Sequence, residues 1–383
     1  MRGGSGCGAG FSSRAKIGGH ATSGGLAARC GVRIVPQLSN GPPAKKTTPI
    51  MPETKFDVVG IGNAIVDVIA RAEDDLLVAE DLVKGSMNLI DETRAETLYD
   101  KMGAATEMSG GSGANTIAGL ASFGGRGAFF GKVAEDGLGR TFSHDIRALG
   151  VHFATPALTA GPSTARCLVM VTPDGERTMN TFLGACQLLG PQDVDEEIVA
   201  ASSILYMEGY LWDPPQAKKA FLHAAEIAKQ NGREVALTLS DSFCVDRYRS
   251  EFLELIKSGT VTLLFGNESE LHSLYETGDT ETAMAALEAD CEFAVVTRSE
   301  KGAVVLKGGE RTAVPAAPVE RIVDLTGAGD LFASGFLFGL ARGQDPETCA
   351  RLGALAAAEI ISHIGARPQV DLKDLARQNG LPV

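Results

Sequence analysis

The segment Val323–Leu340, VDLTGAGDLFASGFLFGL, combines a glycine-rich turn, a carboxylate and an apolar stretch. A helix start offers unpaired N–H groups and a partial positive charge, and glycines without side chains let an anion approach those groups. Asp330 follows in the first turn, where it could take a proton from a hydroxyl group that attacks a bound phosphoryl group. The turn therefore predicts an anion hole at Gly327, Ala328 and Gly329, with Asp330 as the general base.

The apolar side chains after Asp330 predict a helix that is buried on all sides and holds the anion hole rigidly. An alternative is an aspartate that only caps a buried helix after a glycine turn. That alternative leaves the glycines and the alanine before Asp330 unexplained, so the phosphate site is favoured. Two other glycine-rich segments are weaker candidates for a nucleotide-binding site. GIGNAI (60–65) lacks the third glycine of a dinucleotide fingerprint, and RGAFFGKV (126–133) lacks the first glycine and the hydroxyl residue of a phosphate-binding loop.

Seven short apolar segments are predicted to be strands of one mostly parallel sheet. They are rich in β-branched and aromatic residues and mostly lack two-residue alternation, which is typical of strands buried on both faces. Helix-like stretches such as 215–232 lie between many of them, and this order predicts a doubly wound α/β fold. The predicted strands are 57–62, 127–133, 203–209, 234–240, 261–266, 293–297 and 303–307.

Two segments, 66–91 and 152–183, interrupt this pattern and are predicted to form a small β-sheet lid over one end of the main sheet. The second contains a hairpin candidate whose turn is TPDGER. Ligands of a parallel sheet bind at the carboxyl ends of its strands, so the rim of the site is expected there. Polar or glycine residues follow four predicted strands, at 62–63, 240–243, 266–270 and 297–302.

The composition disfavours a nucleic acid or a membrane as the partner and is compatible with a small anion bound at a local site of backbone N–H groups. The net charge of −13 disfavours broad contact with nucleic acid phosphates, and no apolar run is long enough to span a bilayer. The seven scattered cysteines contain no C-x-x-C pair, which is typical of reduced intracellular thiols and disfavours a zinc site.

The first 52 residues contain seven Lys and Arg residues and no Asp or Glu, and they are rich in Gly, Ser and Ala. This composition is typical of an organellar transit peptide, with a disordered tail as the alternative. A transit peptide would direct the folded part, 53–383, to a chloroplast or a mitochondrion. Without one, a cytoplasmic protein is expected.

The chain from about residue 56 to 370 resembles the PfkB, or ribokinase-like, family of sugar and nucleoside kinases. The resemblance implies a three-layer fold and phosphoryl transfer from ATP with magnesium. Leu325 departs from the family pattern, where a small or hydroxylated residue is usual, but it lies outside the anion hole. Four motifs carry the resemblance in the expected order, GIGNAIVD (60–67), GGSGAN (110–115), NESE (267–270) and DLTGAGD (324–330).

The resemblance also implies roles for several carboxylates. Asn267 and Glu270 match a family motif that organises magnesium, partly through water, although a helix start capped by Asn267 is the alternative. Asp67 lies in an apolar stretch, where its carboxylate needs hydrogen-bond donors, and the family binds a pair of sugar hydroxyls at this position. The alternative is an aspartate at a strand end that faces water. The family often uses a monovalent cation, potassium, near the anion hole, and Asp324 would lie close to it.

The remaining site residues are predicted on the same basis. Asn115 offers a donor and an acceptor to a sugar, unless GGSGAN is only a loop-to-helix junction capped by Ser112. Phe182 could stack on a purine, or it is a core residue. The predicted substrate-binding residues are Asn63, Asp67, Gly111, Asn115 and Phe182. The predicted nucleotide-binding residues are Asn267, Glu270, Thr297, Gly302 and Thr326.

GNAIVD and the body of the chain look most like adenosine kinases and their bacterial relatives. The leading hypothesis is therefore transfer of the γ-phosphate of ATP to the 5′-hydroxyl of adenosine. A kinase for ribose, fructose or a related sugar is the alternative, and a non-catalytic organellar scaffold of the same family is a third. A monomer or a homodimer is expected, because lid strands in this family can serve as dimer contacts.

Overall fold

An eight-stranded sheet crosses the described part of the chain, residues 54–383, in this computed structural model. The predicted transit peptide or tail, 1–52, lies outside the described residues. The strand order is β13-β12-β11-β10-β9-β8-β1-β5. The strands are β1 (Phe56–Ile61), β5 (Gly127–Phe130), β8 (Ser202–Glu208), β9 (Glu234–Thr238), β10 (Leu263–Asn267), β11 (Phe293–Thr297), β12 (Ala303–Lys307) and β13 (Glu310–Val314).

The predicted fold class is confirmed. All seven predicted strands are present, and the neighbours from β11 to β5 pair in parallel. β12 pairs antiparallel with β11, and the additional strand β13 pairs antiparallel with β12, which explains why the sheet is mostly rather than wholly parallel.

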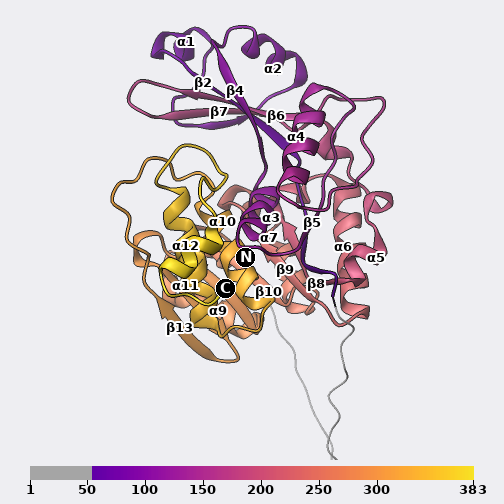
Figure 1. Ribbon diagram of the computed structural model, residues 1–383, viewed down its shortest axis with the longest axis vertical. Helices are drawn as coiled ribbons and strands as arrows, with labels where there is room; N and C mark the ends of the chain where they lie inside the picture. Colours follow the sequence, from indigo (N-terminus) through magenta and orange to yellow (C-terminus); the bar gives the residue numbers. More distant parts are fainter. Residues whose placement is uncertain (1–53) are drawn as a thin grey trace, which may run out of the picture. The chain divides into compact units, whose positions relative to one another are not determined.

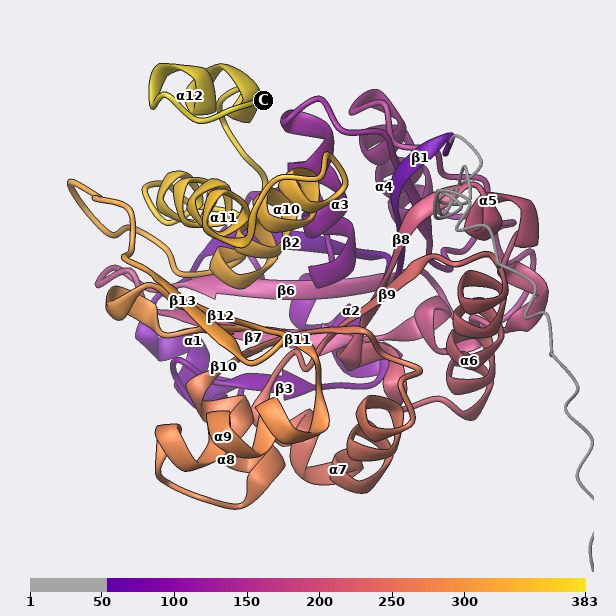
Figure 2. The ribbon, with the colours of Figure 1, turned by 90° about the horizontal axis from the view of Figure 1, so that it is seen from below.

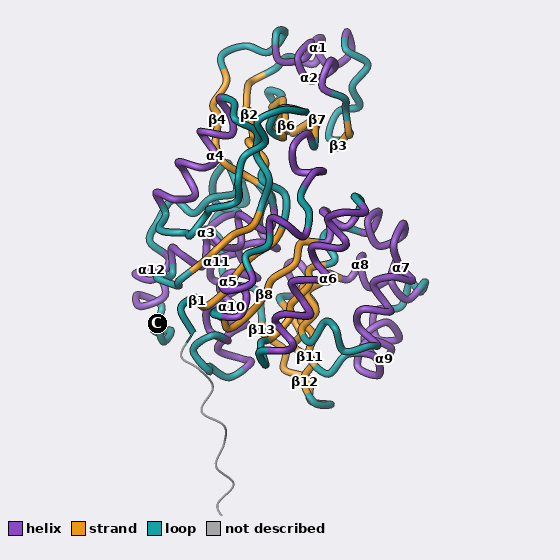
Figure 3. Tube along the Cα trace, turned by 90° about the vertical axis from the view of Figure 1, so that its right-hand side faces the viewer, coloured by secondary structure: helices purple, strands orange, loops and turns teal. Residues whose placement is uncertain are grey.

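Helices cover both faces of this sheet, which makes the three layers of a ribokinase-like fold (Figures 2 and 3). One layer contains α3 (Ser112–Ser122), α10 (Ala328–Leu340) and α11 (Pro346–Ile360); the other contains α6 (Pro215–Gln230), α7 (Ser242–Lys257), α8 (Glu268–Tyr275) and α9 (Thr280–Asp290). Further helices are α4 (Gly137–Ala148), α5 (Glu196–Ala200) and α12 (Leu372–Gln378). No helix within residues 54–383 is both long and apolar enough to cross a bilayer.

A second sheet of five strands, in the order β3-β7-β6-β2-β4, forms the predicted lid (Figure 1). Its strands are β2 (Ile65–Arg71), β3 (Met87–Leu89), β4 (Ala105–Gly110), β6 (Ala165–Val171) and β7 (Arg177–Phe182). The short helices α1 (Asp74–Ala79) and α2 (Glu92–Tyr99) pack on one face of it, over a separate apolar core that includes Leu77, Leu98 and Leu168.

The first lid insert is longer than the predicted range 66–91. It extends to Gly110, because β4 pairs antiparallel with β2 along its whole length. β4 has the sequence ATEMSG, and its first three residues are exposed. The strand therefore lacks the apolar pattern from which the other lid strands could be predicted.

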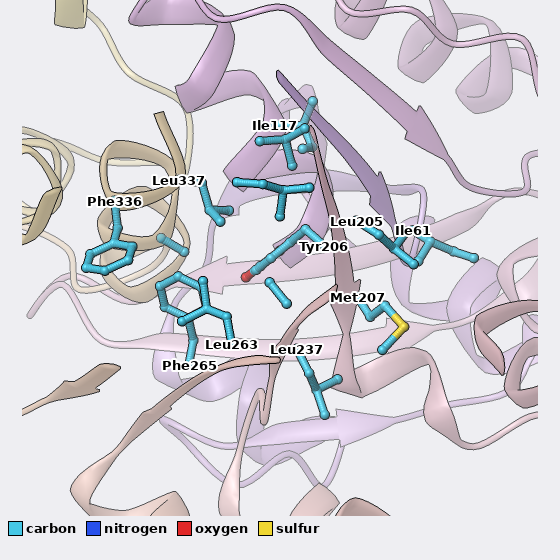
Figure 4. Packing of buried hydrophobic residues seen from close by; sticks show 14 of the residues in the cluster. Ile61, Ile117, Leu205, Tyr206, Met207, Leu237, Leu263, Phe265, Phe336 and Leu337 are labelled. Carbon is cyan, nitrogen blue, oxygen red and sulfur yellow. The ribbon is translucent and has the colours of Figure 1, made fainter. Parts of the chain in front are cut away.

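Helix α10 is buried along most of its length, as its sequence predicts. Every residue from Leu331 to Gly339 is buried. Figure 4 shows Phe336 of this helix facing Phe265 of β10, with Tyr206 of β8 beside them, and the Phe265 and Phe336 ring centroids lie 5.5 Å apart. The helix begins at Ala328, so Asp330 lies in its first turn, as predicted.

The contact between α10 and α11 depends on a glycine. A Cβ atom at Gly335 would lie 2.5 Å from the carbonyl oxygen of Leu352 in α11. No real Cβ contact is that short, so a side chain at position 335 would push the two helices apart.

We therefore expect Gly335→Ala to lower the free energy of unfolding by about 1–3 kcal/mol, because backbone atoms cannot move away as a flexible side chain would. Urea unfolding of the purified protein measures this change. Gly329→Ala in the same helix is the control, because no atom lies within 4 Å of the added Cβ. Equal stabilities of the two variants would show that close packing at Gly335 is not required.

Candidate active site

A cavity of about 810 Å³ lies where the carboxyl ends of the large sheet meet the lid sheet. Strand-end residues Asn63, Glu208 and Thr297 line it on one side, and the β2 residues Ile65 and Asp67 line it from the lid. Its position agrees with the expected place of a ligand in a parallel sheet.

The structure brings most of the predicted site residues to this cavity. They come from segments that lie far apart in the chain, which is typical of an active site in this class of fold. The predicted residues that line the cavity are Asn63, Asp67, Gly111, Asn115, Asn267, Glu270, Thr297, Thr326, Gly327, Ala328, Gly329 and Asp330. Phe182, Gly302 and Asp324 do not line it.

Two side chains of α3 hold the carboxylate of Asp330. The Ser112 hydroxyl donates to it over 2.6 Å, and the Asn115 amide over 2.9 Å. The N-cap residue of α3 is Gly111, so Ser112 contacts Asp330 rather than capping its own helix. Burial raises the pKa of Asp330 above its usual value, while these hydrogen bonds and the positive charge of Arg367 oppose the shift. A raised pKa makes the carboxylate a better proton acceptor.

The start of α10 has the features of an anion hole. Gly327 is the N-cap residue, with a φ of 81° that favours glycine. Among the described residues, no acceptor is found for the backbone N–H groups of Gly327, Gly329 and Asp330, whereas that of Ala328 donates to Leu325. A Cβ atom at Gly329 would meet open space. Free donors and open space beside them are what a bound phosphate needs.

Asn267 and Glu270 close a capping box at the start of α8. The Asn267 side chain accepts from the Glu270 N–H over 2.9 Å, while the Glu270 carboxylate accepts from the Asn267 N–H and from its amide group. The capping alternative is therefore present, and both residues also line the cavity. Burial raises the pKa of Glu270 to about 7. Within residues 54–383, no cluster of three or more His, Cys, Asp or Glu side chains could hold a metal ion.

Asp324 does not line the cavity, and its predicted place near a monovalent cation stays a prediction. Its buried carboxylate forms an ion pair with Arg177 of β7 and accepts hydrogen bonds from the backbone N–H groups of Thr326 and Gly365, each over 3.0 Å. A cation bound to these oxygens would have to compete with the guanidinium group of Arg177. The structure therefore assigns Asp324 a part in joining the lid to the glycine turn.

Phe182 also lies away from the cavity, because side chains alternate along β7. Met179 and Thr181 line the cavity, so Phe182 faces the opposite side of the lid sheet. There the Arg166 guanidinium lies 5.7 Å from its ring centroid. The predicted purine contact is corrected accordingly.

Gly302 does not line the cavity, and the turn between β11 and β12 requires a glycine at this position. Its φ is 84°, and a Cβ atom there would lie 2.0 Å from the carbonyl oxygen of Val314.

Glu208 is a buried carboxylate at the cavity that the motifs do not include. It accepts hydrogen bonds from the Asn63 backbone and amide groups, over 3.1 and 2.6 Å, and from the Gly113 N–H over 2.7 Å. A Cβ atom at Gly62 would lie 2.2 Å from it, which explains the second glycine of GIGN. Burial raises the pKa of Glu208 to about 7. An acidic residue at the end of an apolar strand was the signal that could have identified it.

Arg367 is a second residue absent from the motifs. It donates to the carbonyl oxygens of Ser109 and Ala114, and its Nη2 atom is shielded from solvent without a hydrogen-bond partner among the described residues. Its sequence context, GARPQ, carries no signal for this place beside the site.

Asp67 lies on β2, beside the glycine turn before α3. A Cβ atom at Gly110 would lie 2.4 Å from its carboxylate, so this glycine makes room for it. Burial raises the pKa of Asp67 to about 6; Arg177 and Arg367 oppose this shift, and the charges of Asp330 and Asp324 add to it.

Comparison with known proteins assigns this geometry to a family. A model of the pfkB family of carbohydrate kinases matches residues 57–372. The chain belongs to this family. It is accordingly a phosphotransferase that acts on an alcohol group, as predicted.

Its relatives in the pfkB family include nucleoside and sugar kinases. Adenosine kinase of Saccharomyces cerevisiae is 27% identical over 331 residues, which cover 80% of this chain and 95% of that protein. The crystal structure of a probable sugar kinase from Rhizobium etli CFN 42 is 56% identical, with a TM-score of 0.82, and covers 86% of this chain and 100% of its own. The crystal structure of adenosine kinase from Sinorhizobium meliloti is 58% identical, with a TM-score of 0.80. It covers 85% of this chain and 99% of its own. The resemblance to adenosine kinase-like pfkB members is thus confirmed.

The raised pKa of Asp67 leads to a prediction about stability. A carboxyl group with a raised pKa in the folded state binds its proton more tightly there, so the contribution of Asp67 to stability falls as pH rises from about 4 through 6. Asp67→Asn removes this cost. We expect the variant to exceed the wild type in free energy of unfolding at pH 7, by up to about 3 kcal/mol, with no such gain near pH 4.

Urea unfolding at the two pH values measures this difference. The low-pH comparison controls for any effect of the amide itself on packing. A gain of the same size at both pH values would show that the charge of Asp67 is not its cause.

Proposed function

We propose that this protein transfers the γ-phosphate of ATP to the 5′-hydroxyl group of a nucleoside, with adenosine as the expected acceptor. The observation that carries the proposal is that one cavity combines polar residues around Asp330 with exposed aromatic and apolar side chains, here called the apolar slot. A ribose needs the first, and a purine base needs the second.

The polar residues offer groups that match a ribose and its reacting hydroxyl. Asp67 and Asn63 line the cavity with free hydrogen-bonding capacity, and Asp330 is held beside Asn115. In the proposed step, Asp330 takes the proton of the 5′-hydroxyl while its oxygen bonds to the γ-phosphorus. The bond from that phosphorus to the bridging oxygen breaks, and ADP leaves. The free N–H groups before and at Asp330 stabilise the charge on the transferred phosphoryl group.

The apolar slot contains aromatic side chains that a free sugar would leave uncovered. Phe243 at the start of α7 is 74% exposed, and Tyr210 of the 3-10 helix η3 (Gly209–Trp212) is 36% exposed, although both line the cavity. Among residues 54–383, neither ring forms an aromatic pair, so neither is already used for stacking inside the protein. Met87 and Leu89 extend the slot from the lid and are also exposed. A purine would bury this apolar surface and stack on the rings.

The nucleotide-binding side of the proposal rests on Asn267, Glu270, Thr297 and Thr326, which line the cavity near the anion hole. Magnesium bound with ATP would neutralise part of the phosphate charge. Glu270 already accepts two hydrogen bonds from Asn267, so these residues suit a magnesium ion that keeps its own waters rather than one they ligate directly. The hydrogen bonds that hold Asp330 count against a non-catalytic scaffold, which would not need them.

A substrate panel with the full-length chain tests the proposal. ADP formation is measured with magnesium and with adenosine, inosine, ribose, fructose or no acceptor. We expect turnover with adenosine, and a loss of about 100- to 10,000-fold in Asp330→Asn, because the base is removed. Calorimetric binding of adenosine to this variant controls for its folding.

The panel also distinguishes the alternatives. Turnover with a free sugar but not with a nucleoside would keep the mechanism and overturn the acceptor, in favour of a sugar kinase. If a folded sample forms no ADP with any acceptor in the panel, the non-catalytic scaffold would be favoured.

The aromatic slot yields a separate prediction. Phe243→Ala should raise the KM for adenosine by about 5- to 150-fold, because stacking on a base contributes about 1–3 kcal/mol. The exposed Val78 of α1 does not line the cavity, so Val78→Ala is the matched control. An unchanged KM in Phe243→Ala would remove this ring from the base site.

A further inference from the structure

A charged pair lies in the same wall of the cavity as the two aromatic rings. Asp213 and Arg247 both line the cavity, and Nη2 of Arg247 lies 3.2 Å from the Asp213 carboxylate. Their side chains are 28% and 47% exposed, so both remain accessible from the cavity. Neither residue has a role in the phosphoryl transfer described above.

The pair follows the aromatic residues in both elements of this wall. Asp213 comes three residues after Tyr210, directly at the end of η3, and Arg247 comes four residues after Phe243 on α7. Residues four apart share a helix face, and side chains tilt toward the helix N-terminus. Arg247 therefore lies on the same face of α7 as Phe243, and its guanidinium group lies 5.6 Å from the ring centroid of the next residue, Tyr248. The ion pair links the two elements that carry the rings.

The pair keeps hydrogen-bonding capacity that the protein does not use. Asp213 accepts from Arg247 with one oxygen and from the Tyr248 hydroxyl with the other, so each carboxylate oxygen retains a lone pair. Among the described residues, only Nη2 of Arg247 has a protein acceptor, which leaves its other N–H groups available. A ligand edge that carries a donor next to an acceptor would complement this arrangement.

We propose that Asp213 and Arg247 recognise the hydrogen-bonding edge of the base, an inference that rests on the proposed nucleoside kinase function. Asp213 accepts from an exocyclic amino group, and Arg247 donates to a ring nitrogen next to it. Adenine carries this donor and acceptor side by side. The pair thereby favours 6-aminopurine nucleosides over those that lack the amino group.

Three nucleosides test the assignment with the full-length protein. Adenosine carries the 6-amino donor, inosine carries an acceptor at that position, and purine riboside carries neither. In the wild type we expect kcat/KM for adenosine to exceed that for purine riboside by about 10- to 150-fold, the range for a hydrogen bond to a charged group. In Asp213→Asn this advantage should fall to a few-fold, while kcat/KM for purine riboside stays within about twofold of the wild type.

Glu288→Gln is the matched control. Glu288 forms an ion pair of the same kind with Arg311, over 2.6 Å, and neither of these residues lines the cavity. This variant should leave all three kcat/KM values unchanged. A purely structural role for Asp213 would instead lower the three values in Asp213→Asn by the same factor, and that result would overturn the inference.

The wild-type comparison alone keeps the inference testable if Asp213→Asn fails to fold. Equal kcat/KM values for adenosine and purine riboside in the wild type would contradict recognition of the amino group. Failure of this inference is distinguishable from failure of the proposed function. Nucleoside turnover without the expected ratios overturns only the role of Asp213 and Arg247, whereas no turnover with any nucleoside overturns both.

Discussion

The packing of α10 against α3 determines where the Asp330 carboxylate lies, and the rest of the site is arranged around that position. α3 supplies both side chains that donate to the carboxylate, Ser112 and Asn115. Further along the same pair of helices, a Cβ atom at Gly119 would lie 2.5 Å from the Ser334 hydroxyl oxygen. Because the helices approach this closely, a change in their core contact would also move the Asp330 carboxylate relative to its donors. The contact between α10 and α3 therefore both packs the core and positions the Asp330 carboxylate.

Several carboxylates near this interface are buried, and their burial lowers the stability of the folded protein. Asp67, Glu208 and Asp330 all have raised pKa values, with burial as the largest cause in each case. Arg177 and Arg367 offset part of the cost at Asp67. Burying carboxylates without full compensation is unfavourable for folding, and such groups persist where chemistry or binding needs them. The extensive apolar core of the large sheet is what allows the protein to tolerate them.

Local sequence signals were sufficient for the strands, the glycine turn and the buried helix, because each depends on neighbouring residues. They were insufficient for Arg367, whose contact with Ala114 spans 253 residues of the chain. Phe182 was misplaced because the two-residue alternation of β7 decides which side chains face the cavity, and its register against the sheet is a tertiary property. Glu208 contacts Gly113 across 95 residues, and its importance becomes visible only once β8 lies beside β1.

The residues proposed to perform phosphoryl transfer and the residues proposed to select the acceptor lie on different elements. Asp330 and its donors lie on α10 and α3, within the motifs DLTGAGD and GGSGAN. Tyr210 and Phe243 lie on η3 and α7, outside every motif. A change of acceptor can therefore arise in η3, α7 and the lid without moving the base or the anion hole. This separation explains why the motifs identify a kinase family and leave nucleoside and sugar open, and why the proposed choice of acceptor rests on the side chains of the slot.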